Sequence, residues 1–407
     1  MSELELYPYQ LEGARFLANR RRALLADRMG LGKTIQAIQA ARIINSSNTL
    51  VIGPASSIPN WEAEWQRWGG PGTLEAVSYS SLIRRKGVAA MVPDVVILDE
   101  AHYCKNPNAK RTRAALAVAQ NAPCAWLLTG TPMPNNPAEL WPAVNALWPE
   151  IPAELSIKSH FQWMQRFCYV KHTEYGPKPY GVRNGTLLRQ ILERIALRRD
   201  LNQVGLELPP LRLDIFRLKK DDVANGGNFE AYEAYERTEE NYTSTLRRML
   251  GEAKALTVAR QIIEEMRDSQ YSKIVVLYYH HLVRDTLHQA FEASGLRVTG
   301  FDGGTPQGER KAAIDLFQND PEVHVFLAQQ AAAGTAITLT AASEIVLVEP
   351  AWSPEDNFQA IARVHRIGQG SPCRARIFAV SGTLDEAIMG TLANKVRMLE
   401  AAGLKGE

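Results

Sequence analysis

The stretch ALLADRMGLGKT, residues 23–34, runs from an apolar segment through a glycine-rich loop into a helical pattern. Glycines let backbone N–H groups turn inward onto phosphate oxygens. Gly30, Gly32, Lys33 and Thr34 supply those glycines, a cation for the β- and γ-phosphates and a hydroxyl for Mg²⁺. The strict phosphate-loop pattern begins with glycine, and Asp27 stands there instead. The stretch predicts a nucleoside triphosphate site, with a helix N-terminus carrying chance glycines as the alternative.

A second acidic motif, DEAH at residues 99–102, directly follows the apolar run 95–98. Ligands of open α/β sheets gather at the carboxyl ends of the strands. Asp99 can hold Mg²⁺ through water, and Glu100 can orient and deprotonate an attacking water. The tetrapeptide alone is weak evidence, but its place after a buried strand and downstream of a phosphate loop predicts hydrolysis of ATP.

Further apolar runs indicate the fold class. They are continuous instead of alternating, which is typical of strands covered on both faces of a parallel sheet. Segments with helical periodicity lie between them, so the sequence predicts an α/β architecture. The runs are residues 23–26, 49–52, 95–98, 125–128, 274–279, 323–328, 345–348 and 375–380, and the main helical segments are 34–44, 60–68, 284–294 and 309–318.

The strands fall into two groups, which predicts two α/β lobes at residues 1–150 and 213–407. The stretch between them, 151–212, is expected to be a small helical, basic insertion and linker. Residues 157–200 contain nine Lys or Arg against three Asp or Glu, a local charge of about +6. A basic helix is expected at 187–199, and LPPL at 208–211 is expected to lead out of the first lobe.

Bulk composition excludes several other classes. The chain has 407 residues, 45% hydrophobic and 22% charged, with a net charge of +2. This is the balance of a globular protein, and it does not by itself indicate nucleic acid. The four cysteines show no zinc spacing, and there is no signal pattern or membrane-length apolar run. The expected location is the cytoplasm or the nucleoid.

Taken in order, these motifs resemble those of the Swi/Snf-type DNA translocases of helicase superfamily two. The resemblance covers nearly the whole chain, and residues 349–369 are its most specific part. Residues 198–213 most resemble the annealing-helicase branch of that family. The matching segments are YPYQLEGARFL (7–17), DRMGLGKT (27–34), PASSIPNWEAEWQRW (54–68), DEAHYCKNPNAKRTRA (99–114), LLTGTPMPNNPAELW (127–141), FDGGT (301–305), AAAGTAITLT (331–340) and EPAWSPEDNFQAIARVHRIGQ (349–369).

The resemblance implies two RecA-like lobes that use ATP and Mg²⁺. It implies Thr34 and Asp99 as metal-binding residues, and Lys33, Asp99, Glu100, Arg363 and Arg366 as catalytic residues. The family often has an acid before the first of these arginines, and Ala362 stands there instead, so Arg366 ranks at least equal to Arg363. The implied nucleotide-binding residues are Gln10, Asp27, Met29, Gly30, Leu31, Gly32, Lys33, Thr34 and Gln359.

Contacts to the DNA backbone are implied by the same motifs. Small hydroxyls and amides suit phosphates, which give affinity without reading bases. Lys110, Arg111 and Arg113 form a basic cluster nearby, for which a solvated surface is the alternative. The implied contact residues are Ser56, Ser57, Tyr79, Ser80, Lys105, Asn106, Thr305 and Thr335.

The resemblance implies an ATP-dependent translocase that moves along double-stranded DNA without true strand separation. It is expected to act as a monomer, and forked or branched DNA is included among its substrates. Its ATP hydrolysis should rise on adding DNA. Two alternatives remain open: an RNA-dependent motor of the same superfamily, and a catalytically inactive nucleic-acid-binding scaffold. The sequence does not separate remodelling of DNA structures from displacement of bound proteins.

Overall fold

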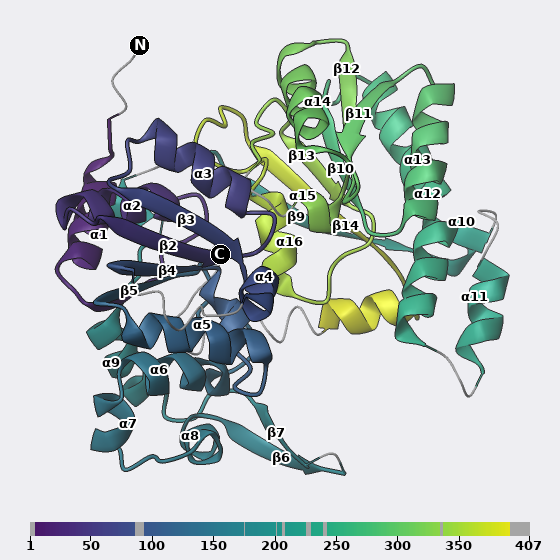
Figure 1. Ribbon diagram of the computed structural model, residues 1–407. Helices are drawn as coiled ribbons and strands as arrows, with labels where there is room; N and C mark the ends of the chain where they lie inside the picture. Colours follow the sequence, from purple (N-terminus) through teal and green to yellow (C-terminus); the bar gives the residue numbers. More distant parts are fainter. Residues whose placement is uncertain are drawn as a thin grey trace. The chain divides into compact units, whose positions relative to one another are not determined.

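The structure is a computed structural model that describes residues 5–85, 93–174, 176–200, 202–205, 208–224, 229–238, 242–333 and 337–390. The described residues form two compact units (Figure 1). The described residues of the first unit end at residue 205, and those of the second begin at residue 208. Each unit is built around its own parallel sheet.

The sheet of the first unit has six strands in the order β3-β2-β4-β5-β1-β8, all parallel. The four apolar runs expected here are confirmed as β1, β2, β4 and β5. The edge strand β8 is only two residues long and was not expected. The strands are β1 (Arg22–Leu25), β2 (Asn48–Gly53), β3 (Thr73–Ser78), β4 (Val95–Asp99), β5 (Cys124–Leu128) and β8 (Ala196–Leu197).

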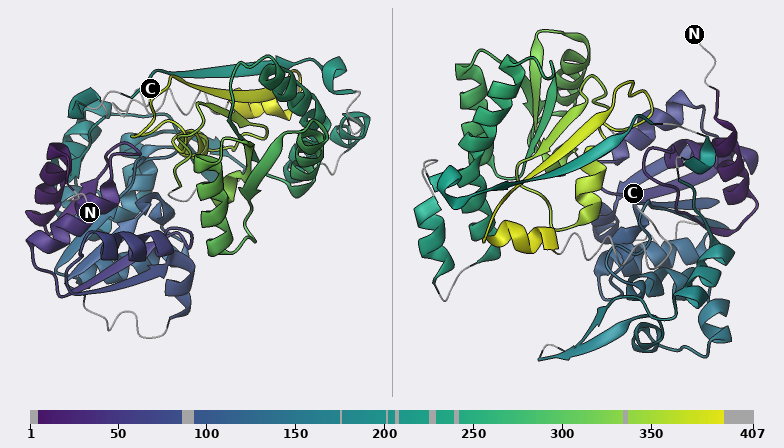
Figure 2. Two further views of the ribbon diagram at one scale, coloured as in Figure 1. Left: turned by 90° about the horizontal axis from the view of Figure 1, so that it is seen from above. Right: turned by 180° about the vertical axis from the view of Figure 1, so that it is seen from behind.

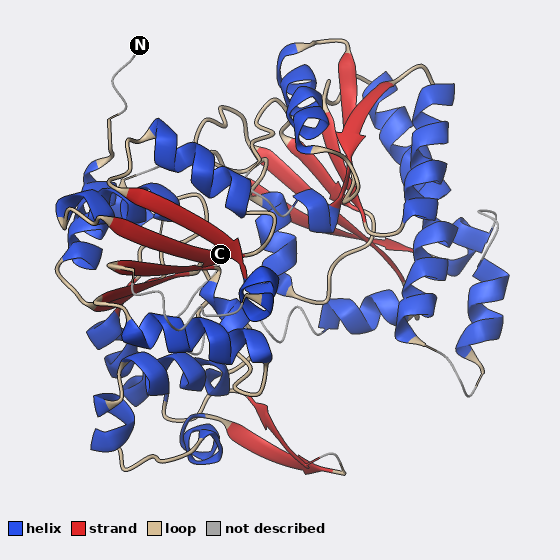
Figure 3. Ribbon diagram, in the orientation of Figure 1, coloured by secondary structure: helices blue, strands red, loops and turns tan. Residues whose placement is uncertain are grey.

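Helices cover both faces of this sheet (Figures 1 and 3). Successive strand residues point to opposite faces, so Leu24 packs into one hydrophobic cluster while Ala23 and Leu25 pack into the other. One face carries α1 (Pro8–Ala18), α2 (Lys33–Ile43) and α3 (Ile58–Arg67). The other carries α4 (Tyr79–Arg84), α5 (Lys110–Asn121), α6 (Trp141–Leu147), α7 (Glu150–Glu154), α8 (His160–Phe167) and α9 (Gly185–Ile195).

The stretch between the two groups of strands shares the core of the first unit. Trp163 and Phe167 of α8 and Leu188 of α9 belong to the same hydrophobic cluster as the sheet. The basic helix expected at 187–199 ends earlier, at Ile195, because the chain then pairs with β1 as β8. The glycine- and proline-rich piece forms a two-stranded antiparallel hairpin, β6 (Tyr169–Thr173) and β7 (Gly176–Tyr180), separate from the main sheet (Figure 3).

The second unit also has a six-stranded parallel sheet, in the order β11-β12-β10-β13-β14-β9. The four apolar runs expected here are confirmed as β10, β12, β13 and β14. The edge strand β9 pairs with β14 along eight residues. The strands are β9 (Leu211–Leu218), β10 (Ile274–Tyr278), β11 (Arg297–Phe301), β12 (Val323–Gln329), β13 (Glu344–Leu347) and β14 (Cys373–Val380).

Two hydrophobic clusters again lie on opposite faces of the second sheet. One face packs on α10 (Lys220–Ala224), α11 (Phe229–Glu236), α12 (Thr243–Arg267) and α13 (His281–Ala293). The other packs on α14 (Gln307–Asn319), α15 (Gln330–Ala333) and α16 (Pro354–Ile361) (Figure 2). The predicted α/β class with two parallel sheets is therefore confirmed. No helix within the described ranges is long and apolar enough to cross a bilayer.

Candidate functional site

The glycine-rich loop joins β1 to α2 in the first unit. Gly30 has φ 89° and Gly32 has φ 72°, left-handed conformations that a side chain would strain. Gly32 is the N-cap residue of α2, so the amides of the first helical turn receive no side-chain cap from it. Leu31 between the glycines is fully buried and anchors the loop. The local geometry is that of an anion-binding helix N-terminus.

Lys33, the first residue of α2, folds back over this loop. Its Nζ donates to the backbone carbonyl of Asp27 at 2.9 Å. The turn after β5 approaches the same place: a Cβ on Gly130 would lie 3.2 Å from Met29 Cγ and 3.7 Å from Lys33 Nζ. The ammonium group therefore sits at the mouth of the loop, where a phosphate would replace the carbonyl as its partner.

Gln10 on α1 lies beside the loop. Its side chain is 5% exposed, and its Oε1 accepts from the backbone N–H of Tyr7 at 3.1 Å. A Cβ on Gly32 would come within 2.6 Å of Gln10 Nε2, so the absence of a side chain at Gly32 makes room for this amide. The structure thus brings together two predicted nucleotide-binding segments that are distant in sequence.

Asp99 and Glu100 lie at the carboxyl end of β4. Trp61 Nε1 of α3 donates to Asp99 Oδ2 at 2.9 Å, which fixes that carboxylate. Glu100 is left-handed, with φ 47° and ψ 54°, and begins the short 3₁₀ helix η2 (Ala101–Cys104). Such a conformation costs a non-glycine residue about 1 kcal/mol or more. It turns the chain sharply at the strand end, so that two consecutive carboxylates occupy one site.

Burial, followed by the neighbouring Glu100 carboxylate, raises the pKa of Asp99 to about 6. The hydrogen bond from Trp61 and the positive charge of Lys33 act in the opposite direction. The electrostatic interaction between Lys33 and Asp99 indicates that the carboxylates lie near the phosphate-binding loop. A divalent cation would do the same more strongly, because it stabilises the ionised carboxylate.

His102 connects this site to the turn after β5. Its Nδ1 lies 3.3 Å from Glu100 Oε2 and 3.2 Å from Thr129 Oγ1. The same threonine hydroxyl accepts from the backbone N–H of Thr131 at 3.1 Å. The last residue of the acidic motif is therefore linked to the segment 127–141, one of the segments that carry the family resemblance.

Sequence reasoning missed Arg199, whose side chain binds Asp27 at the start of the glycine-rich loop. Its Nη2 and Nε donate to the two carboxylate oxygens of Asp27 at 2.6 and 3.1 Å. Nη2 also donates to Gln36 Oε1 at 2.8 Å, and Nη1 donates to the carbonyl of Tyr9 at 2.6 Å. Asp27 is fully buried, so its side chain serves this ion pair instead of facing the mouth of the loop. An acid directly after an apolar strand needs a partner, but the sequence does not say which one.

The predicted DNA-contact residues of the first unit are not all exposed. Ser56, Ser80 and Asn106 are exposed, whereas Lys105 is half-buried and lies 3.7 Å from Glu139 Oε1. Tyr79 is only 3% exposed.

Tyr79 has a structural role in place of the one indicated by the sequence. Its hydroxyl donates to the carbonyl of Asp99 at 3.0 Å. Its ring stacks on Tyr103, with centroids 5.4 Å apart. Direct contact of its side chain with DNA does not fit this burial, and the residue instead supports the strand end that carries Asp99.

The second unit holds the remaining predicted residues. Thr305 caps a turn, its hydroxyl donating to Asp302 Oδ1 at 3.1 Å. Gln359 is half-buried on α16, and the carbonyl of Arg363 accepts from Leu339 N–H at 2.9 Å. Arg366 Nη1 donates to the carbonyl of Ile337 at 2.7 Å, and burial lowers its pKa. Thr335 lies outside the described residues.

The fold and this site define a class: a phosphate-loop protein built from two parallel α/β units, with paired carboxylates at a strand end of the first. Two family descriptions match the chain. The SNF2-related domain matches residues 9–94 and 78–268, and the helicase conserved C-terminal domain matches 254–368. The chain belongs to the SNF2 family of helicase-like proteins.

Curated relatives agree with this assignment. The DNA annealing helicase and endonuclease ZRANB3 of Homo sapiens is 30% identical over 97% of this chain and 40% of its own length. The SWI/SNF-related regulator of chromatin subfamily A-like protein 1 of Xenopus tropicalis is 28% identical over 98% of this chain and 45% of its own. The chain thus spans less than half the length of these two relatives.

Among solved structures, the chain is similar to the Sulfolobus solfataricus SWI2/SNF2 ATPase core in complex with double-stranded DNA. It is 22% identical, covers 99% of this chain and 94% of that chain, and gives a TM-score of 0.46.

Proposed function

We propose that this chain hydrolyses ATP and uses the energy to move along double-stranded DNA. The proposal that the chain hydrolyses ATP rests on one observation. Lys33 and the Asp99–Glu100 pair lie at the same edge of the first sheet. Lys33 lies over a loop with left-handed glycines, and its charge acts on Asp99. Positioning and charge neutralisation are the main requirements of phosphoryl transfer.

Each residue of this site suits one part of that chemistry. The loop amides and Lys33 would hold the phosphates, and Gln10 would contact the base. The Thr34 hydroxyl and the Asp99 carboxylate are hard oxygen ligands of the kind that Mg²⁺ takes. When bound, Mg²⁺ would neutralise charge on the phosphates. Glu100 would accept a proton from the attacking water, and its fixed backbone holds it beside Asp99.

Arg363 and Arg366 remain candidates for stabilising charge on the γ-phosphate. Arginine suits that role because it stays charged and presents a rigid fork of donors. Substitution tests it directly. Arg366→Ala should leave ATP binding intact and lower turnover by roughly 10³-fold, the lower end for arginine fingers. Normal turnover in both Arg363→Ala and Arg366→Ala would remove these residues from the site.

The DNA half rests on family membership and on charge. A relative named a DNA annealing helicase matches almost the whole of this chain. The net charge near +6 in residues 157–200 and the exposed Ser56, Ser80 and Asn106 suit phosphate contacts. Forked or branched duplexes are included as substrates, and we propose a monomer as the active form.

The proposal is tested by measuring phosphate release from ATP. The rate is measured first without nucleic acid and then with duplex DNA, single-stranded DNA, forked DNA or RNA added. Turnover should be slow alone and rise most with DNA that contains a duplex. Stimulation by RNA alone would indicate an RNA-dependent motor. No release under any condition, with DNA still bound, would indicate an inactive scaffold. Triplex displacement would then show whether hydrolysis moves the protein along the duplex.

A further inference from the structure

The β6–β7 hairpin of the first unit carries a surface that the hydrolysis site does not use. In its antiparallel ladder Tyr169 lies opposite Tyr180, and Lys171 lies opposite Lys178. Opposite residues share a face of the ribbon, and so do residues two apart on one strand. Both tyrosines and both lysines therefore lie on one face, which we call the tyrosine–lysine face.

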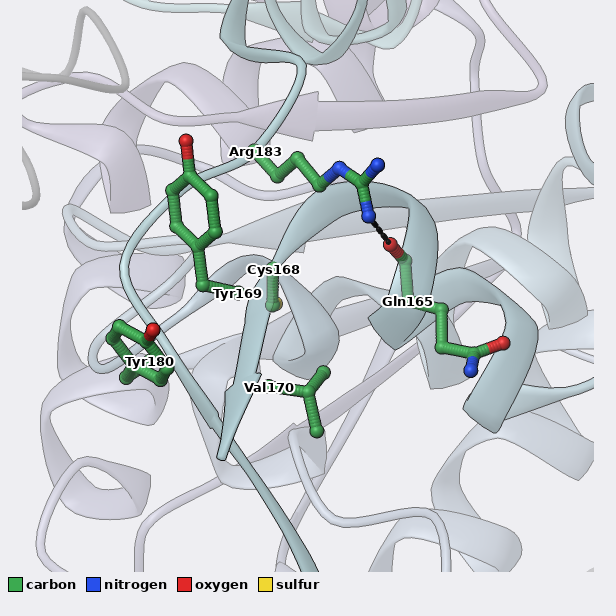
Figure 4. A pocket seen from close by; sticks show the side chains of 6 residues that line it. All are labelled: Gln165, Cys168, Tyr169, Val170, Tyr180 and Arg183. Atoms are coloured by element: carbon green, nitrogen blue, oxygen red, sulfur yellow. Dashed lines mark hydrogen bonds between the residues drawn. The ribbon is translucent and has the colours of Figure 1, made fainter. Parts of the chain in front are cut away.

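The aromatic end of this face is open to solvent. Tyr169 is 52% exposed and Tyr180 is 53% exposed, with ring centroids 5.9 Å apart. Together with Gln165, Cys168, Val170 and Arg183 they line a hollow of about 520 Å³ at the root of the hairpin (Figure 4). Large exposed aromatic pairs are uncommon unless they bind something.

The other end of the face holds charge that the fold does not neutralise. Lys171 and Lys178 are exposed, and no carboxylate among the described residues forms an ion pair with either. Like charges directly opposite each other weaken a strand pair. Arg183, also exposed, spends one guanidinium N–H on the carbonyl of Gln165 at 3.3 Å. A bound polyanion would relieve this repulsion.

The contacts that hold the hairpin in place use neither the two tyrosine rings nor the two lysine side chains. Val170 packs against the small cluster of Ala138, Met164 and Cys168. Arg183 N–H donates to the carbonyl of Phe167 at 2.8 Å, which closes the root of the hairpin. The tyrosine–lysine face can therefore be changed without removing the packing that holds it.

We propose that the tyrosine–lysine face binds unpaired nucleotides, with bases stacked on Tyr169 and Tyr180 and phosphates near Lys171, Lys178 and Arg183. Exposed aromatic rings interleaved with cations are the recurrent means of holding single strands without reading their sequence. A duplex hides its base faces and would leave the rings without partners. The inference deepens the proposed function and rests on it: the chain would hold single-stranded DNA at a place separate from the nucleotide site.

Fluorescence anisotropy of the full chain with a labelled oligodeoxythymidylate of about 16 nucleotides, without ATP, tests this surface. The variant Tyr169→Ala/Tyr180→Ala should bind roughly tenfold or more weakly, since each stacked base contributes about 1–3 kcal/mol. Tyr169→Phe/Tyr180→Phe keeps the rings and should bind as the parent does. Tyr242→Ala is the matched control, because Tyr242 is 66% exposed in the second unit.

The charge half has its own readout. Lys171→Gln/Lys178→Gln should reduce the slope of log affinity against log salt by about 1.4, from about 0.7 per phosphate contact on single strands. Lys219→Gln, another exposed lysine, is the control and should leave the slope unchanged.

Three results would overturn the proposal. One is parental affinity for the oligonucleotide in the Tyr→Ala pair. A second is a loss of duplex-stimulated phosphate release in the Tyr→Ala pair that equals its loss of oligonucleotide affinity, which would mean that the hairpin contacts the duplex. A third is loss of binding to an acidic peptide with binding to DNA retained, which would mark a protein-docking surface. Because the binding assay contains no ATP, a chain without DNA-stimulated hydrolysis would overturn the proposed function while this test could still succeed.

Discussion

The β1–α2 junction of the first unit and the β10–α13 junction of the second solve the same problem differently. In both, a parallel strand ends, the chain turns, and a helix begins. In the first unit, glycines form the turn and leave room for an external anion. In the second, Glu349 Oε2 accepts from the backbone N–H groups of Tyr279 and His280 at 2.8 and 3.0 Å.

The second junction thus contains its own anion. Glu349 is 2% exposed, and its Oε1 lies 2.6 Å from His280 Nδ1. The comparison teaches that a strand-to-helix turn whose amides already bind an internal carboxylate is not open to an external anion in the same way. It also explains why only one of the two similar sheets is expected to hold phosphate.

The sharpest way to break this comparison is to disable the first junction. Lys33→Ala should lower ATP turnover by at least roughly 10³-fold, because a cation over the phosphates is lost in a preorganised site. Glu100→Gln should lower turnover as much while ATP still binds, since only the proton acceptor is removed. Phosphate release and binding of a fluorescent ATP analogue measure the two effects. Turnover retained in both variants would refute the assigned site.

The next largest effect is expected from removing the ion pair between Arg199 and Asp27 at the first junction. Arg199→Ala leaves the buried Asp27 carboxylate without its ion pair, which costs about 3–5 kcal/mol of unfolding free energy. Seven of the eight tryptophans lie before residue 164, so urea unfolding followed by tryptophan fluorescence reports on the first unit. Arg199→Ala/Asp27→Asn should recover part of the loss. A midpoint unchanged from the parent would show that the pair does not hold the loop.

Removing the Glu349 carboxylate at the second junction should lower the free energy of unfolding by a smaller amount. Glu349→Ala leaves two partly buried backbone donors, the N–H groups of Tyr279 and His280, without their acceptor, which costs about 3 kcal/mol or less. Glu349→Gln keeps an acceptor oxygen and should cost less. Far-UV circular dichroism should show an earlier unfolding transition, while the fluorescence transition of the first unit stays in place. Loss of the fluorescence transition instead would mean that the two units do not unfold separately.

The smallest expected effect is on pH dependence. Folding raises the pKa of Asp99 from 3.8 to about 6, so the folded chain binds more protons than the unfolded chain between these values. The contribution of Asp99 to the stability of the metal-free chain therefore falls as pH rises through that window and is constant above it. Mg²⁺ needs the ionised carboxylate, so its affinity should rise with pH through about 6.

Thermal shifts of the ADP-bound chain measure this change. The Mg²⁺ concentration that gives half the maximal shift should be roughly tenfold lower at pH 7 than at pH 5. Asp99→Asn should show little pH dependence. An equal requirement at both pH values in the parent would contradict the raised pKa.

The central strands were predictable because their residues are buried on both faces. The runs at 95–98 and 274–279 are apolar throughout, and both are strands in the structure. β9 was not predicted, because its LRLDIFRL sequence alternates at the edge of a sheet. β8 has only two residues, so its identity depends on pairing with β1 and not on local pattern.

The same division holds for the site. Residues within one motif, such as Asp99 and Glu100, could be placed from their neighbours in sequence. Arg199 could not, because it meets Asp27 across 172 residues. The family resemblance implied a DNA contact for Tyr79, whereas its ring is stacked on Tyr103 and buried, a contact between segments that the motif does not describe.

The position of β9 has a consequence for synthesis of the chain. β9 pairs only with β14 in the described sheet, and about 150 residues separate the two strands. At roughly 5–20 residues per second, β9 would emerge on the order of ten to thirty seconds before its partner. Arg212, Asp214 and Arg217 lie between its apolar residues along this strand. Such charges are a known safeguard against pairing with other chains, and here they would protect a strand that must wait.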